Sequence, residues 1–183
     1  MNSFASLLER NVAFAATDAK EHVPAIPFIP FQGSFVITCI DPRVDPAAIM
    51  GVELGDAIVL RNVGGRVTPE SLGDAAYISY LFETKAPEGA PWFELAVIHH
   101  TDCGSAWLAN DHLRHDFAER TGFNEEALAQ RPVVDPERTV RADVNRLLSA
   151  PQLSPKIRIS GHVYDVATGL VTTVIDASSP ARR

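Results

Sequence analysis

Residues 34–43, SFVITCIDPR, contain the pattern that decides the fold of this chain. The first six residues form a continuous run of apolar and β-branched side chains, which is typical of a strand buried on both faces of a sheet. The run ends at Cys39, and a turn that carries Asp41 and Arg43 follows it directly. We therefore expect a buried strand whose carboxyl end presents chemically active side chains.

Helical patterns separate three further runs of the same kind, Ala57–Arg61, Glu94–His99 and Lys156–Ser160. Two of the helices are expected to begin at Thr68 and Asp135, because each is a capping residue followed by Pro-Glu. The alternation of strands and helices predicts an α/β fold with a mostly parallel sheet.

The tail of the chain predicts a closing hairpin. Val163–Val166 and Leu170–Ile175 have the composition of two short strands, and Thr168-Gly169 between them favours a turn.

The N-terminal part has a different pattern. Residues 3–17 place apolar side chains on one helical face, and Val23–Pro30 contains three prolines, which predicts an extended arm. An arm this apolar packs either on its own domain or on a dimer partner.

Composition excludes several functional classes. The chain has 183 residues, of which 46% are hydrophobic and 21% charged, and its net charge is −7, which argues against nucleic acid or an anionic membrane as the main partner. No apolar run is long enough to span a bilayer, and no signal peptide is evident at the N-terminus. The two cysteines are a poor disulfide framework, so we expect them to be reduced and the protein to be cytoplasmic.

Chemically active residues follow the predicted strands. Cys39 ends the first run, residues 62–65 (Asn-Val-Gly-Gly) follow the second, and His100 and Cys103 follow the third. Carboxyl ends of parallel strands meet at one edge of a sheet, which is where ligands bind. Two thiolates and an imidazole would give zinc three ligands and leave one position open, as in catalytic zinc sites. The simpler alternative is that the cysteines are small buried apolar residues.

Asp41 and Arg43 lie beside Cys39. A carboxylate there can orient a zinc-bound water, or it can occupy the fourth zinc position itself. An arginine fork can hold that carboxylate off the metal through two hydrogen bonds. The alternative is a surface salt bridge of little energetic consequence.

The combined motifs resemble one family. The pattern C-x-D-x-R at residues 39–43, followed by H-x-x-C-G at residues 100–104, resembles the β-class carbonic anhydrases, in particular their compact prokaryotic branch. Residues 55–65 resemble the family segment G-D-x-x-V-x-R-N-A-G, and residues 161–169 resemble its closing hairpin. Two departures are Pro42 between the aspartate and the arginine, and His99 in place of a glycine.

The resemblance implies a single domain over residues 1–183, with four parallel strands, an added edge strand and flanking helices. It implies a homodimer or a dimer-based oligomer, in which residues 1–33 pack on the partner, and one zinc ion per chain. The implied site residues are the zinc ligands Cys39, His100 and Cys103, the Asp41–Arg43 dyad, and Gly104, whose backbone N–H would contact the substrate.

The implied activity is hydration of CO2 to bicarbonate by a zinc-bound hydroxide. The alternative within the same family type is hydrolysis of carbonyl sulfide (COS) or carbon disulfide at the same site, because the nucleophile would attack the same kind of carbon. A non-catalytic zinc protein closed by Asp41 is disfavoured by the intact Asp41–Arg43 pair, and a thiol redox protein by the lack of a C-x-x-C motif.

Overall fold

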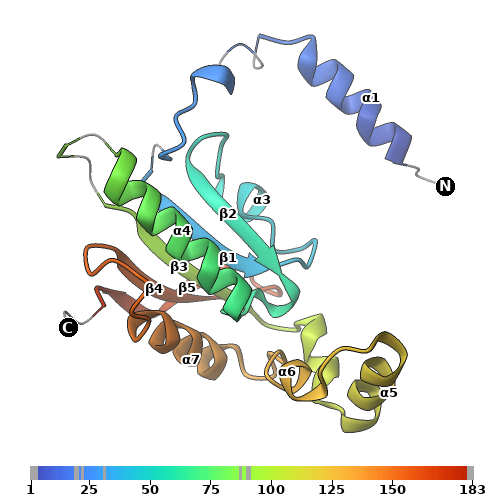
Figure 1. Cartoon of the computed structure of the whole chain (residues 1–183). Coiled ribbons are helices and arrows are strands. Elements are labelled where there is room, and N and C mark those ends of the chain that lie inside the picture. The colour runs from blue at the N-terminus through green and yellow to red at the C-terminus, as the bar shows by residue number, and fades with distance from the viewer. Residues whose placement is uncertain are drawn as a thin grey trace.

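A computed structural model describes residues 4–18, 21, 23–30, 32–86, 88–89 and 92–180. Its centre is a five-stranded sheet in the order β2-β1-β3-β4-β5 (Figure 1). The first four strands pair in parallel and β5 pairs antiparallel with β4. The expected α/β fold, a mostly parallel four-stranded sheet with an added edge strand, is therefore confirmed. The strands are β1 (Ser34–Cys39), β2 (Ala57–Asn62), β3 (Glu94–His100), β4 (Arg158–Asp165) and β5 (Leu170–Ser178).

Helices cover the sheet and extend beyond it. The α-helices are α1 (Phe4–Ala15), α3 (Pro46–Met50), α4 (Pro69–Lys85), α5 (Asp111–Thr121), α6 (Glu125–Ala129) and α7 (Pro136–Leu148). The 3-10 helices are η1 (Val23–Ala25), η2 (Val63–Gly65) and η3 (Gly104–Ala109).

The main core lies between the sheet and helices α4 and α7. Ile78 and Phe82 of α4 and Val144 of α7 belong to one buried cluster with Ile37 and Val97 of the central strands. Both helices begin where the sequence predicts, because Thr68 and Asp135 accept hydrogen bonds from backbone N–H groups of the first turn.

The predicted boundary within the tail was wrong. Lys156–Ser160 and Val163–Val166 were expected to be separate strands, but one continuous strand, β4 (Arg158–Asp165), contains most of both. Gly161, between them, continues the strand and lies under α7. A Cβ atom at this position would lie 2.9 Å from Val144 Cγ2, so the glycine permits the close approach of helix and sheet.

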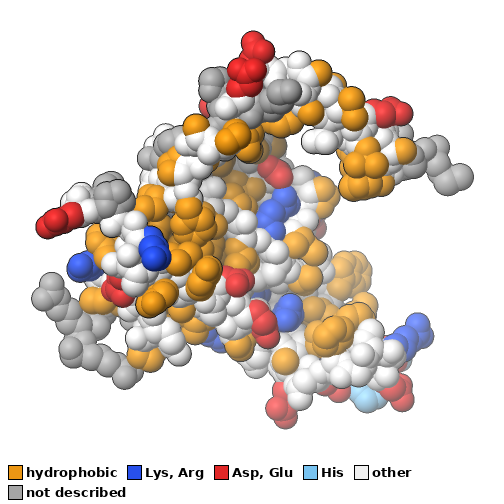
Figure 2. Space-filling model, turned by 45° about the horizontal axis from the view of Figure 1, so that its top comes forward, with side chains coloured by type: hydrophobic (Ala, Val, Ile, Leu, Met, Phe, Trp, Pro, Cys, Tyr) orange, Lys and Arg blue, Asp and Glu red, His pale blue; other side chains and the backbone are white. Residues whose placement is uncertain are grey.

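The N-terminal helix stands apart from the sheet. Figure 1 shows α1 projecting from the domain, and none of its residues is buried. Its apolar face is open to solvent, since Phe4 and Val12 are 72% and 70% exposed. Figure 2 shows hydrophobic side chains along this projecting segment. Packing of residues 1–33 on a dimer partner stays a prediction, and residues 1–3, 19–20, 22 and 31 lie outside the described residues. Among the described residues, no helix is long and apolar enough to cross a membrane.

Candidate metal centre

The structure brings the three predicted ligand residues together. Cys39 ends β1 and His100 ends the neighbouring parallel strand β3, so the two strand ends lie side by side. Cys103 follows three residues after His100. One donor atom from each of the three side chains lies within 4.8 Å of the others, and all three residues are buried.

The donor atoms fit a zinc ion. His100 Nδ1 donates a hydrogen bond to the carbonyl of Thr101 at 2.9 Å, which leaves Nε2 as the atom with a free lone pair. Nε2 is buried and has no hydrogen-bond partner among the residues that the structure describes, a costly state unless another group binds there. The two sulfur atoms lie 3.8 Å apart and form no disulfide. Two sulfurs at about 2.3 Å from a tetrahedral zinc ion would be separated by about this distance.

The sulfur atoms differ in their tendency to lose a proton. The hydrogen bond with Cys103 holds the pKa of Cys39 well below its ordinary value, and the backbone N–H of Asp41 also points at the Cys39 sulfur, at 3.4 Å. The same contact with Cys39, together with burial, raises the pKa of Cys103. The two sulfurs are therefore hydrogen-bonded to each other, and binding of a metal cation would require both to be deprotonated.

Ser105 supports the second sulfur. Its hydroxyl oxygen lies 3.1 Å from Cys103 Sγ and accepts a hydrogen bond from the backbone N–H of Val133 at 3.1 Å. Val133 donates to the oxygen of this hydroxyl and does not engage its hydrogen. The hydroxyl can therefore donate to Cys103 Sγ when that sulfur is a thiolate. No pattern in the sequence pointed to this residue.

Asp41 and Arg43 form the predicted two-bond pair. Arg43 Nε donates to Asp41 Oδ1 at 3.0 Å and Nη2 donates to Oδ2 at 2.8 Å. The Arg43 backbone N–H also donates to Oδ1, at 2.9 Å. These hydrogen bonds from Arg43 lower the pKa of Asp41 to about 2, so its carboxyl is ionised at neutral pH. The side chain of Asp41 is only 13% exposed, unlike that of an ordinary surface salt bridge.

Arg61 fixes the loop on which this pair lies. Its Nε donates to the carbonyl of Cys39 at 2.9 Å, and its Nη2 donates to the carbonyl of Asp41 at 2.7 Å. Nη1 forms an ion pair with Asp45 at 2.8 Å. The sequence placed Arg61 in a family-like segment but gave no indication of these contacts.

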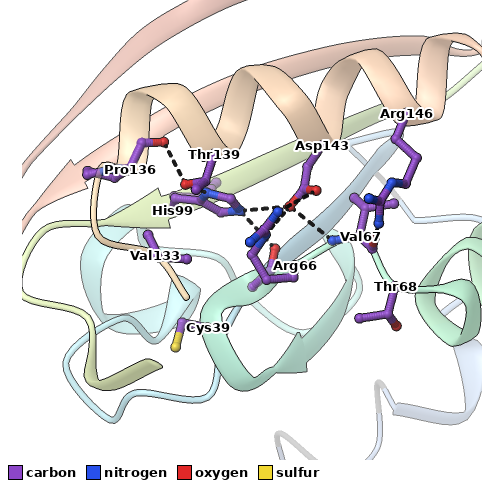
Figure 3. A network of polar contacts seen from close by, with 12 residues as sticks. Cys39, Arg66, Val67, Thr68, His99, Val133, Pro136, Thr139, Asp143 and Arg146 are labelled. Carbon is purple, nitrogen blue, oxygen red and sulfur yellow. Dashed lines mark hydrogen bonds and ion pairs between the residues drawn. The ribbon is translucent and has the colours of Figure 1, made fainter. Parts of the chain in front are cut away.

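A buried polar network lies behind the centre. Figure 3 shows His99, Arg66 and Asp143 pointing toward one another. His99 Nδ1 lies 2.8 Å from Thr139 Oγ1, and Nε2 donates to the carbonyl of Gly65 at 3.2 Å, with Asp143 Oδ2 at 3.3 Å. The side chain of His99 is completely buried within this network.

Gly65 connects this network to Cys39. A Cβ atom at Gly65 would lie 2.8 Å from the carbonyl carbon of Thr38 and 2.9 Å from the Cys39 nitrogen, and φ is +64°. Only glycine fits this approach. His99 therefore donates to the carbonyl of Gly65, the residue that packs against the backbone of Cys39.

A cavity of about 540 Å³ adjoins the cluster and is lined by Cys39, Asp41 and Gly104. Gly104 begins η3, and apart from its own helix backbone and chain neighbours no described residue has a heavy atom within 4 Å of the position where its Cβ would be. The rest of the lining is largely apolar and includes Val63, Trp107, Leu108, Leu113, Phe117 and Phe123. Cys39, Asp41 and Gly104 thus face a space suited to a small apolar molecule.

Comparison with known proteins agrees with this geometry. The family model described as carbonic anhydrase matches residues 34–171, which include all of the candidate site residues. The chain belongs to the β-carbonic anhydrase family.

Individual members of the family support the assignment. β-Carbonic anhydrase 1 of Mycobacterium bovis is 28% identical over 155 residues, which cover 81% of this chain and 86% of that protein. A carbon disulfide hydrolase of an Acidianus species is 25% identical over 158 residues, or 73% of each chain. The solved carbonic anhydrase of Streptococcus mutans is 29% identical, with a TM-score of 0.73 over 95% of this chain and 98% of that one.

Proposed function

We propose that this chain is a zinc-dependent enzyme that hydrates CO2 to bicarbonate, with one zinc ion per chain. Cys39, His100 and Cys103 would be the protein ligands, and a solvent molecule would take the fourth position. The observation that carries the proposal is the buried, unpartnered Nε2 of His100 beside two thiols. Three protein ligands are typical of catalytic rather than structural zinc.

The side chains around the metal position have complementary roles. A zinc ion held there supplies a nucleophile at neutral pH by lowering the pKa of a bound water to about 7. Asp41 is ionised and can only accept hydrogen bonds, so it would orient a solvent molecule at the fourth position by accepting a hydrogen bond from it. Arg43 occupies both carboxylate oxygens and thereby keeps Asp41 away from the metal position.

Gly104 and the cavity would handle the substrate. The backbone N–H of Gly104 would donate to the oxygen on which negative charge develops as the carbon is attacked. The apolar lining suits a linear substrate without charge, and it contributes few polar groups that would hold competing water.

Hydrolysis of COS or carbon disulfide is the second candidate. It is favoured by the apolar cavity and by the similarity to the Acidianus protein, whose name is carbon disulfide hydrolase. The same groups would act, and sulfide would leave. CO2 hydration ranks first because the M. bovis relative, which shares a larger part of this chain, is a carbonic anhydrase by name.

The proposal includes a homodimer or dimer-based oligomer in the cytoplasm. The exposed apolar face of α1 supports a second copy as partner, since no residue of that helix is buried in its own chain. The unbonded cysteines favour a reducing compartment. The net charge of −7 disfavours nucleic acid and anionic membrane as partners.

Two assays on the purified zinc-loaded protein test the substrate. We expect rapid CO2 hydration in a stopped-flow pH-indicator assay and slower sulfide release from COS. Replacement Cys39→Ala should release zinc and abolish both activities. The exposed residue His112, whose side chain is 84% exposed, provides the matched control His112→Ala, which should keep both. Strong sulfide release with negligible CO2 hydration would reverse the ranking, and full activity in Cys39→Ala would disprove the ligand assignment.

A further inference from the structure

We propose that Asp102 is a positioning residue that acts through Arg43 to fix Asp41. Its consequence for turnover rests on the proposed function. The contact itself is independent of the reaction and can be tested without it.

Arg43 joins two loops that carry candidate ligands. On one side its guanidinium donates to Asp41, in the loop that follows Cys39. On the other side Nη1 donates to Asp102 Oδ2 at 2.7 Å, and Nη2 donates to the Asp102 carbonyl at 2.9 Å. Asp102 lies between His100 and Cys103 in the chain. Arg43 is therefore held from both sides.

The backbone of Asp102 is unusual. Its φ is +53°, and among the described residues it is the one non-glycine residue with positive φ. Aspartate and asparagine adopt this region more readily than other residues that carry a side chain, and such conformations persist where surrounding contacts hold them. The two oxygens that Arg43 binds, one in the side chain and one in the backbone, belong to this residue.

Without Asp102, the Asp41–Arg43 pair would still form, but it would open more often and would not be tied to the loop of His100 and Cys103. The contacts to Asp102 tie the guanidinium to the loop of His100 and Cys103, and so fix the position of the Asp41 carboxylate relative to the three ligand residues. Arg43 and Asp102 have side chains that are 47% and 76% exposed, so solvent screens their attraction. We therefore expect an effect of roughly twofold to fivefold, the range of exposed ion pairs.

Two variants distinguish the effect of the Asp102 carboxylate from the effect of its backbone conformation. Asp102→Gly removes the side chain but tolerates positive φ, and Asp102→Asn tolerates positive φ while keeping an oxygen that accepts from Nη1. If Asp102→Gly changes the exchange rate or kcat/KM and Asp102→Asn stays close to the wild type, the change comes from the loss of the contact to Arg43. Zinc content is measured in each variant and is expected to equal that of the wild type.

The first measurement does not depend on activity. The hydrogen exchange rate of the Arg43 Nε–H, which donates to Asp41, is measured by NMR in the zinc-loaded protein, with the signal assigned from its loss in Arg43→Gln. We expect exchange to be roughly twofold to fivefold faster in Asp102→Gly and close to the wild-type rate in Asp102→Asn. An unchanged rate in Asp102→Gly, or loss of zinc from that variant, would overturn the proposal.

The second measurement is a double-mutant cycle on CO2 hydration. Asp102→Gly should lower kcat/KM roughly twofold to fivefold in the wild-type background and have no further effect in Arg43→Gln. An equal loss in both backgrounds would show that Asp102 does not act through Arg43. If the wild type lacks CO2 hydration, the proposed function fails, whereas the exchange measurement still decides the role of Asp102.

Discussion

The guanidinium of Arg66 donates two hydrogen bonds to the carboxylate of Asp143, at 2.6 Å from Nε and 3.1 Å from Nη2. Their side chains are 10% and 1% exposed, so the pair lies in the interior. Asp143 also accepts from the backbone N–H of Val67 at 3.1 Å and lies beside His99 Nε2. This contact attaches helix α7 to the segment that packs against Cys39.

Removal of the Asp143 charge should destabilise the protein strongly. Asp143→Asn leaves Arg66 buried without its counter-charge, and breaking one partner of a buried pair costs about 3–5 kcal/mol. Urea unfolding measures the change in free energy. Asp111→Asn is the matched control, because that carboxylate pairs with Arg114 but is 89% exposed, and we expect a loss of at most about 1 kcal/mol. Equal losses in the two variants would contradict the importance of the buried pair.

The Asp143 carboxylate should also make the free energy of unfolding depend on pH in the acidic range. Burial alone would raise the pKa of Asp143, but hydrogen bonds from His99 and Arg66 outweigh burial and lower it. A folded-state pKa below the unfolded value of about 3.9 stabilises the protein above that pH, and the contribution is lost as pH falls further. Below about pH 4, the unfolding free energy should therefore fall more steeply in the wild type than in Asp143→Asn. Parallel curves, measured by urea unfolding from pH 6 to 3, would contradict this.

Gly65→Ala should lose more stability and more zinc than the strain of an alanine at positive φ alone would cause. Gly51 has a similar φ of +66°, but beyond its chain neighbours no described residue has a heavy atom within 4 Å of the position where its Cβ would be, so Gly51→Ala measures the cost of positive φ alone. That cost is about 1–2 kcal/mol. We expect Gly65→Ala to lose more stability and most of its zinc, because the new methyl group meets the backbone of Thr38 and Cys39. Retention of zinc at the level of Gly51→Ala would argue against this contact.

Gly104 offers a test of the proposed backbone donor. Proline at the first position of a helix is tolerated, and Cys103 before it already has ψ of 128°, which suits a following proline. Gly104→Pro should therefore fold and bind zinc while losing the N–H. Loss of one such donor lowers kcat by about 10²–10³-fold. Gly104→Ala keeps the N–H and should remain active, so equal activity of the two variants in the CO2 assay would exclude the donor role.

Much of the fold could be predicted because its signals are local. Continuous apolar runs marked the parallel strands, and Thr68 and Asp135 marked two helix starts. The convergence of Cys39 and His100 followed from the general rule that parallel strands end at the same edge. The break expected between Lys156–Ser160 and Val163–Val166 was wrong, because Gly161 continues the strand and admits α7.

The supporting contacts could not be predicted in the same way. Arg66 and Asp143 are 77 residues apart, and their pairing depends on how α7 packs on the sheet. One signal was available: Asp143 lies between Val140 and Val144 on the apolar face of its helix, where an unpaired charge would be costly. Asp102 gave no signal, because its importance lies in a backbone angle and a contact across two loops.

The zinc coordination sphere tests the central claim most directly. X-ray absorption at the zinc edge of the purified protein should show one zinc per chain with two sulfur neighbours at about 2.3 Å and two nitrogen or oxygen neighbours at about 2.0–2.1 Å. That result would match Cys39, Cys103, His100 and one further light atom. A zinc ion with no sulfur neighbours, or a folded protein that takes up no zinc, would contradict the account.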